Sequence, residues 1–144
     1  MFIIPIEFAT PEYDEAVRLR YDILRAPLGL EYTPEQLAEE WNQHHLAAYD
    51  HQNRLVGYLN LTPAGQGEVK MRQVAIAQSV QGQGIGRHLV EYSEAFARAR
   101  GFEKMVLHAR ETAVPFYLKL GYAIVGEQFE EVTIPHFKMW KNLV

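Results

Sequence analysis

The fold is decided by one stretch of the sequence, Val74-Ala75-Ile76-Ala77-Gln78-Ser79-Val80-Gln81-Gly82-Gln83-Gly84-Ile85-Gly86-Arg87. It begins as an apolar strand and passes through a short turn into a glycine-rich segment. The apolar residues that then recur at helical spacing are Ile85, Leu89, Tyr92, Phe96 and Ala97. Gly101 follows as a typical helix stop. The stretch therefore predicts a strand, a glycine turn and an amphipathic helix in succession.

The segment Gln81–Arg87, called the glycine loop below, is suited to hold phosphate oxygens. Glycine tolerates positive φ and lets the backbone come close to a ligand. The first N–H groups of a helix lack an internal partner, and the helix dipole places roughly half a positive charge there. Gln81, Gln83 and Arg87 can add side-chain donors. On local geometry alone, a tight turn whose glycines serve only packing remains the alternative.

Two well-known phosphate loops do not match this segment. The dinucleotide fingerprint needs G-x-G-x-x-G and an acidic residue at the end of the next strand. Here the spacing from Gly82 is G-x-G-x-G, and the next predicted strand ends at His108-Ala109. The nucleoside-triphosphate loop needs Gly-Lys-Ser/Thr, a triplet that the chain lacks.

The rest of the chain alternates strand and helix patterns. Period-two apolar residues, buried-type runs and turn signals predict strands over residues 2–8, 46–49, 54–61, 68–77, 104–109, 123–127 and 133–141. Pro caps and helical spacing predict helices over residues 10–25, 33–40, 85–100 and 113–120, with a loop over 63–67. The strands on either side of the glycine-loop helix should pair in parallel. This order predicts a single α/β domain over residues 1–144.

Composition narrows the function classes. The chain has 144 residues, no cysteine, and a net charge of −4 from 14 basic and 18 acidic residues. The lack of cysteine excludes disulfides, thiolate-bound zinc, iron–sulfur clusters and a cysteine nucleophile. A mildly acidic chain is a poor candidate for binding nucleic acid. No apolar run is long enough to span a membrane, and Met1–Glu7 has no basic export signal, so the cytoplasm is expected.

Two motifs in order make the sequence resemble the GNAT superfamily of N-acetyltransferases. The family's acyl-coenzyme A motif runs Gln/Arg-x-x-Gly-x-Gly/Ala after a strand, and Gln81, Gly84 and Gly86 fill it in register. The family's helix motif Ala-x-x-x-Tyr-x-x-x-Gly-Phe/Tyr is matched by Ala113 to Tyr122. The resemblance covers residues 46–141 well. It implies a mixed, splayed β-sheet with helices on both faces and acetyl transfer from acetyl-CoA to a primary amine.

The resemblance also implies a coenzyme site. The pyrophosphate of coenzyme A would bind the backbone N–H groups of Gln83–Arg87, and the pantetheine arm would run beside Val74–Ile76. An N–H of Val74 or Ala75 would polarise the thioester carbonyl. The cofactor-binding residues expected are Val74, Ala75, Ile76, Gln81, Gly82, Gln83, Gly84, Ile85, Gly86, Arg87, Phe116 and Tyr117. Many relatives carry Asn where this chain has Arg110, so Arg110 could bind a phosphate, pair with Glu111 or face solvent.

The resemblance implies that Tyr117, in the helix motif, is the general acid. Placed near the sulfur, its hydroxyl would protonate the departing thiolate. The alternative is an amphipathic aromatic residue that closes the core. Replacing Tyr117 with Phe is therefore expected to lower turnover with little loss of coenzyme affinity.

The base and the acceptor site are less sharply marked. An alkylammonium acceptor must lose a proton before it attacks. Glu68, at the start of a central strand, and His108, at the end of the next strand, are the candidate bases, each with a structural alternative. Glu131 and His136, together with Glu130, are candidates to line the acceptor site, where plain solvation explains the glutamates equally well.

The sequence leaves the acceptor, the oligomeric state and two alternative functions open. The expected acceptor is a small-molecule or peptide amine, with no metal, nucleic acid or membrane involved. The histidines near His44 lack H-E-x-x-H spacing, so a zinc site is not expected. A homodimer could form through Phe137, Met139 and Trp140. The rival functions are a transferase with a longer acyl donor and a catalytically silent domain that binds acyl-CoA or a partner protein.

Overall fold

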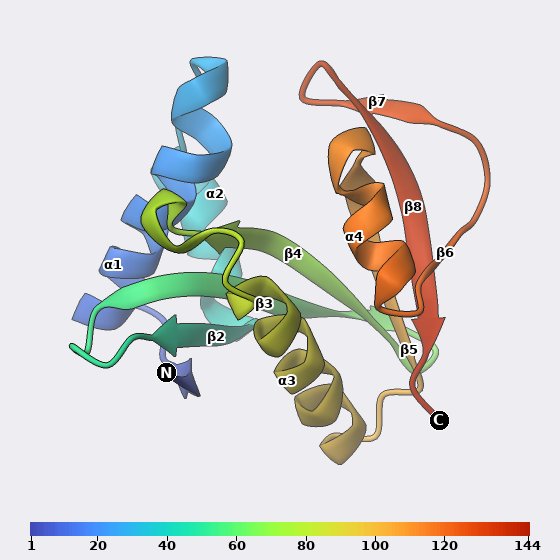
Figure 1. The fold of residues 1–144 in the computed structure, drawn as a ribbon, viewed down its shortest axis with the longest axis horizontal. Coiled ribbons are helices and arrows are strands. Elements are labelled where there is room, and N and C mark those ends of the chain that lie inside the picture. Colours follow the sequence, from blue (N-terminus) through green and yellow to red (C-terminus); the bar gives the residue numbers. More distant parts are fainter. The chain divides into compact units, whose positions relative to one another are not determined.

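The computed structural model describes every residue, Met1–Val144, and divides into two compact units. The first unit comprises residues 1–62 and 73–93, and the second comprises 63–72 and 94–144. Three elements, labelled in Figure 1, include residues of both units: β3 (Leu55–Gly65), β4 (Glu68–Ile76) and α3 (Ile85–Ala99). One functional domain over residues 1–144 stays a prediction.

Antiparallel strands build the sheet of the first unit. β1 (Phe2–Ile6) pairs with β2 (His44–Tyr49) along its whole length, and β2 pairs with β3. β2 is buried from His45 onward, in keeping with a strand that has a neighbour on both sides. β1 is an edge strand in which Phe2 and Ile4 are exposed and only Ile6 is buried.

The first two helices begin at the predicted caps. α1 (Pro11–Arg20) starts after Thr10, whose hydroxyl accepts a hydrogen bond from the Tyr13 amide at 3.2 Å. α2 (Pro34–Ala38) starts after Thr33, which forms a capping box with Gln36. In both helices a proline occupies the first turn, where no amide hydrogen is needed.

A buried polar network holds α1 and the turn before β2 to the sheet. The Arg20 guanidinium is fully buried and donates to both Glu40 carboxylate oxygens at 2.7 Å each. The Tyr13 hydroxyl also donates to Glu40, at 2.7 Å. Burial alone would raise the pKa of Glu40, but the hydrogen bonds and charge of Arg20 lower it below its usual value. Glu40 is therefore held as a carboxylate inside the protein.

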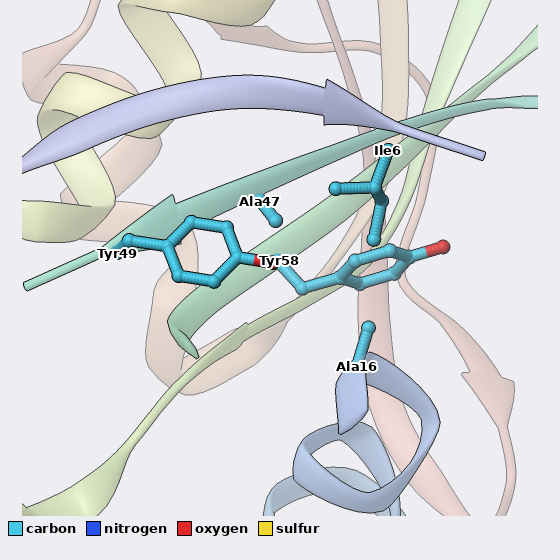
Figure 2. Packing of buried hydrophobic residues seen from close by; sticks show 5 residues of the cluster. All are labelled: Ile6, Ala16, Ala47, Tyr49 and Tyr58. Carbon is cyan, nitrogen blue, oxygen red and sulfur yellow. The ribbon is translucent and has the colours of Figure 1, made fainter. Parts of the chain in front are cut away.

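The same network fixes the tautomer of His45. Its Nε2 lies 3.0 Å from the Glu40 carbonyl oxygen, which can only accept, so Nε2 carries the hydrogen. Its Nδ1 then accepts from the Tyr58 hydroxyl at 2.6 Å, and that hydroxyl in turn accepts from Asn60 at 3.3 Å. Figure 2 shows the Tyr58 ring between Ile6 of β1 and Ala16 of α1, within a cluster of buried residues.

This arrangement predicts a pH dependence of stability. Burial, the largest influence, lowers the pKa of His45 below its ordinary 6.5. In the unfolded chain, His45 therefore becomes protonated near pH 6.5, whereas in the folded chain it becomes protonated only at a lower pH. The free energy of unfolding should fall as pH drops from about 6.5 through the lower folded pKa. Urea titrations at several pH values between 7 and 5 measure the slope.

The matched variants are His45→Asn and His51→Asn, because His51 is exposed. The first should be less stable at pH 7 and should lack this part of the slope. The second should keep the wild-type slope. An unchanged slope in His45→Asn would contradict the assigned tautomer and burial effect.

The second unit holds the parallel pair. β4 pairs in parallel with β5 (Lys104–Arg110) from Glu68↔Lys104 to Met71↔Leu107, which confirms the predicted pairing. β8 (Ile134–Asn142) pairs antiparallel with the whole of β5 and also with the short strands β6 (Ala123–Ile124) and β7 (Phe129–Glu131). α4 (Val114–Lys119) contacts β5. The mixture of parallel and antiparallel pairs confirms the predicted mixed α/β class.

Several predicted boundaries were wrong. The first strand ends at Ile6 rather than residue 8, and the first helix is α-helical only to Arg20. It continues as a π-helical turn, Tyr21–Arg25, and then as a 3-10 turn that ends at Gly29 with φ +68°. β3 runs to Gly65, so the predicted loop at 63–67 is mostly strand.

A further strand was missed in the C-terminal part. β7 lies between the strands predicted over residues 123–127 and 133–141, where no strand was predicted. The turn after it places Val132 and Thr133 at positive φ, a conformation that β-branched residues do not signal. Met139 is fully buried within the chain, whereas Phe137 and Trp140 are partly exposed, and the homodimer stays a prediction. None of the helices has the length and apolar composition that a membrane crossing requires.

Candidate functional site

The glycine loop joins β4 to α3 in the first unit. A short 3-10 turn, Gln78–Val80, follows β4, and α3 begins at Ile85. Gly82 and Gly84 have φ of +82° and +83°, and a Cβ at either would meet nothing within 4 Å. The backbone conformation, rather than crowding by neighbours, therefore selects glycine at these positions. Residues 81–84 are exposed, so ligand atoms have access to the backbone there.

Unpaired amides lie at the start of α3. The first hydrogen bond of this helix runs from the His88 amide to the Gly84 carbonyl at 3.1 Å. The amides of Ile85, Gly86 and Arg87 therefore have no acceptor inside the helix. The Arg87 side chain is 61% exposed, and its Nε lies 3.6 Å from Glu91. The loop thus presents several donors and a cation to solvent.

The Gln81 side chain makes a hydrogen bond to the end of β4. Its Nε2 donates to the Ile76 carbonyl oxygen at 3.0 Å. This bond closes the loop back onto the end of β4. Gln81 therefore helps to shape the loop through this contact.

The end of β4 is held close to β3 and α3. The Ala77 amide donates to the Val56 carbonyl at 2.8 Å. A Cβ at Gly57 would lie 3.1 Å from Ile76 Cδ1 and 3.4 Å from Ile85 Cγ2, so glycine permits this close packing. Ala75 is buried, whereas Val74 and Ile76 are partly exposed.

Tyr117 and Phe116 lie on α4 in the second unit. Tyr117 is buried, and its ring makes edge contacts with the Phe116 and Tyr122 rings at centroid distances of 5.0 and 5.7 Å. The Tyr122 hydroxyl donates a hydrogen bond of 2.8 Å to Glu94 Oε2. Burial raises the pKa of Tyr117 above its ordinary value of 10.0. The Tyr117 hydroxyl is therefore protonated at neutral pH, as any tyrosine with a pKa of about 10 or more is.

The structure brings together three residues that the sequence suggested separately. His108 on β5, Glu131 on β7 and His136 on β8 form what is called the histidine cluster here. His108 Nδ1 lies 3.0 Å from one Glu131 oxygen, and His136 Nε2 lies 3.7 Å from the other. The pairings Phe129↔His136 and Arg110↔His136 place these strands side by side. In Figure 1, β7 and β8 accordingly run as neighbours.

The geometry of His136 leaves one nitrogen ready to take a proton. Its Nδ1 lies 2.8 Å from the Ile134 carbonyl oxygen and must donate to it, so in the neutral ring Nε2 holds the lone pair. A proton taken up at Nε2 would face the Glu131 carboxylate. His136 is buried, whereas the Glu131 side chain is 46% exposed. The cluster therefore places an imidazole lone pair beside a carboxylate.

Positive charge surrounds this carboxylate. Lys70 Nζ lies 3.4 Å from His108 Nδ1. Burial alone would raise the pKa of Glu131, but the hydrogen bond and charge of His108, with His136 and Lys70, lower it below its usual value. Burial, aided by Arg72 and Lys138, lowers the pKa of Lys70. Lys70 is a site residue that the sequence did not suggest, because a lysine within a strand is ordinarily solvated.

Glu68 and Arg110 occupy the two ends of the same pair of strands. Glu68 is paired with Lys104 in the strand register and lies 3.9 Å from its ammonium. His108 lies farther along β5, about 13 Å from Lys104 at the usual rise of a strand. The structure therefore does not bring Glu68 to the histidine cluster. Arg110 stands opposite His136 in the pairing of β5 with β8.

The Arg20–Glu40 network and its link through Tyr32 to β4 were not foreseen. The Tyr32 hydroxyl donates to Gln73 Oε1 at 2.6 Å, and the Arg20 guanidinium lies 4.8 Å from the centre of the Tyr32 ring. Residues 20, 32, 40 and 73 lie in separate segments, so no local pattern connects them. No group of three or more His, Cys, Asp or Glu side chains is placed to hold a metal ion.

Known proteins resemble this chain over most of its length. The model of the Acetyltransferase (GNAT) domain matches residues 15–143. The uncharacterized protein YyaT of Bacillus subtilis is 31% identical over 99 residues, which are 69% of this chain and 66% of that protein. The chain thus spans just under two thirds of this relative's length.

Solved structures share the fold. A Lactobacillus plantarum protein assigned to the N-acetyltransferases superposes with a TM-score of 0.87 at 24% identity over 100% of both chains. An aminoglycoside 6'-N-acetyltransferase in complex with coenzyme A gives a TM-score of 0.81 at 23% identity, over 100% of this chain and 98% of that one. Since the family model covers nearly the whole sequence, the chain belongs to the GNAT family of acetyltransferases.

Proposed function

We propose that the chain transfers an acetyl group from acetyl-CoA to a primary amine within a ternary complex. The observation that carries the proposal is the exposed glycine loop, where Gly82 and Gly84 turn the backbone and α3 begins with unpaired amides. Such a helix start favours a polyanion through its N–H groups and its dipole. The coenzyme A held by the structurally similar aminoglycoside acetyltransferase supports the same ligand here.

Each part of the coenzyme is assigned to a part of the first unit. The pyrophosphate would accept hydrogen bonds from the amides of Gln83–Arg87, and Arg87 would add its charge. The pantetheine arm would run beside Val74–Ile76. An N–H of Val74 or Ala75 would donate to the thioester carbonyl oxygen, where negative charge develops as the amine attacks.

The reaction needs two proton transfers. The amine nitrogen bonds to the thioester carbonyl carbon, and the carbon–sulfur bond then breaks. Tyr117 would protonate the departing thiolate, because a tyrosine hydroxyl carries its proton at neutral pH. The histidine cluster would take the proton from the amine. The contacts of Glu68 favour an ion pair with Lys104 over the role of base.

The acceptor is proposed as a small-molecule or peptide amine that meets Glu131 and His136. A partly exposed carboxylate with a pKa held low stays negative and attracts an ammonium group. The lack of cysteine is in keeping with a reducing compartment, and the cytoplasm is the compartment we propose.

The test is release of coenzyme A thiol from acetyl-CoA in the presence of a panel of amines. Longer acyl-CoA donors are run in parallel. Turnover with acetyl-CoA and one amine class supports the proposal. Faster turnover with a longer acyl-CoA would mean that the longer acyl group, and not acetyl, is the group transferred. A silent binding domain would show thermal stabilisation, about 2.7 kcal/mol at one hundred times Kd, without turnover on any amine.

A further inference from the structure

Gln73 interrupts β4 with a left-handed backbone. Its φ is +58°, a region that favours glycine, although the residue lies inside a strand. A glutamine stays there only where its surroundings compensate for the conformation. The hydrogen bond of 2.6 Å from the Tyr32 hydroxyl to Gln73 Oε1 is such a compensation.

Tyr32 is itself firmly fixed. The guanidinium groups of Arg20 and Arg25 lie 4.8 and 4.4 Å from the centre of its ring. Arg20 is fully buried and bound through two hydrogen bonds to Glu40. The hydroxyl that holds Gln73 is therefore anchored to the core of the first unit. Tyr32, Gln73 and these anchoring side chains are called the Tyr32 clamp.

The conformation of Gln73 sets the direction of the next amide. The peptide group that links residues 73 and 74 carries the Val74 N–H, and it turns with the backbone angles of Gln73. Farther along, the Ala77 N–H points to Val56 of β3. Amides alternate in direction along an extended strand. The N–H groups of Ile76 and Val74 therefore point to the edge of β4 that faces away from β3.

We propose that Tyr32 and Gln73 are positioning residues for acyl transfer. Their hydrogen bond holds the left-handed turn at Gln73, and this turn aims the Val74 N–H at the thioester carbonyl oxygen. The inference rests on the proposed function and selects Val74 over Ala75 as the donor. A donor aimed in advance at the developing oxyanion needs no reorganisation during the reaction.

The first test is Tyr32→Phe, which removes the hydroxyl and keeps the ring between the two arginines. It should lower kcat about tenfold, a part of the hundredfold or more that loss of a whole oxyanion donor costs. KM for acetyl-CoA should stay within about twofold, because the pyrophosphate contacts are untouched. The control is Tyr21→Phe, an exposed tyrosine on the π-helical turn, which should leave both constants unchanged.

The second test is a rescue. Gln73→Ala must adopt the left-handed turn without the clamp, whereas Gln73→Gly adopts it readily. Gln73→Gly should therefore be about tenfold more active than Gln73→Ala, because alanine is disfavoured in the left-handed conformation by an energy that corresponds to about this factor. In the Gln73→Gly background, adding Tyr32→Phe should have no further effect. An equal loss from Tyr32→Phe in both backgrounds would overturn the proposal.

A third measurement separates this inference from the proposed function. If no amine supports turnover, the proposed function fails, and the Val74 amide resonance of the ligand-free protein still reports on the clamp. The resonance should shift in Tyr32→Phe, and should be the same in Gln73→Gly with and without Tyr32→Phe. A Val74 resonance that does not move in Tyr32→Phe would overturn the inference.

Discussion

Replacing Tyr117 with phenylalanine should lower kcat about a hundredfold or more, the usual contribution of a general acid. The substitution removes the proton donor and keeps the buried ring that contacts Phe116 and Tyr122. Affinity for coenzyme A, measured by calorimetry, should stay within about twofold, because the hydroxyl acts in the transition state rather than in ground-state binding. Initial rates of thiol release give kcat.

The matched control is Tyr49→Phe. Tyr49 is also buried, and its hydroxyl has no hydrogen-bond partner, so its loss removes no interaction. This variant should keep wild-type kcat and be at least as stable as the wild-type protein, because a buried hydroxyl without a partner is removed. A kcat for Tyr117→Phe that equals the wild-type value would remove Tyr117 from the mechanism, and an equal loss in Tyr49→Phe would point to a general effect of the substitution.

The second large effect concerns stability. Arg20→Met should lower the free energy of unfolding by about 3 to 5 kcal/mol, because it leaves the Glu40 carboxylate buried without its main partner. The pair is 0% and 8% exposed in its side chains, with both hydrogen bonds at 2.7 Å. Urea denaturation at pH 7 measures the change.

Two further variants make this prediction specific. Arg54→Met breaks the pair of Arg54 with Asp50, in which the arginine side chain is 69% exposed, and should cost about 1 kcal/mol or less. Arg20→Met combined with Glu40→Gln should cost less than the sum of the single changes, because no unpaired charge remains. Additive losses, or a loss in Arg20→Met as small as that in Arg54→Met, would contradict the view of the network as a tightly coupled ion pair.

Local patterns in the sequence predicted the elements whose signals are local. The caps at Thr10 and Thr33, the helix from Ile85 and the parallel pairing of β4 with β5 are all confirmed. Each depends on residues a few positions apart or on the connection of one strand to the next through a helix. The same holds for the glycine loop, because a glycine in the sequence directly indicates a position where positive φ is allowed.

The features that the sequence did not reveal depend on residues far apart in the chain, or on positive φ at residues other than glycine. The turn at Val132 and Thr133 has positive φ in residues that normally avoid it, so β7 was missed. The Arg20–Glu40 pair and the Tyr32–Gln73 bond join segments separated by 20 and 41 positions. His108, Glu131 and His136 were suggested singly, and only the pairing of β5, β7 and β8 brings them together.

The central claim is that the start of α3 holds the diphosphate of an acyl carrier, and calorimetric titration with coenzyme A tests it most directly. Gly84→Ala and Gly101→Ala are the variants, since both glycines have similar φ, +83° and +85°, and neither Cβ would meet an atom within 4 Å. We predict binding to the wild-type protein and to Gly101→Ala with equal Kd, and a Kd at least about tenfold higher for Gly84→Ala, because strain at Gly84 displaces the loop amides. Absence of heat with the wild-type protein, or an unchanged Kd in Gly84→Ala, would contradict the claim.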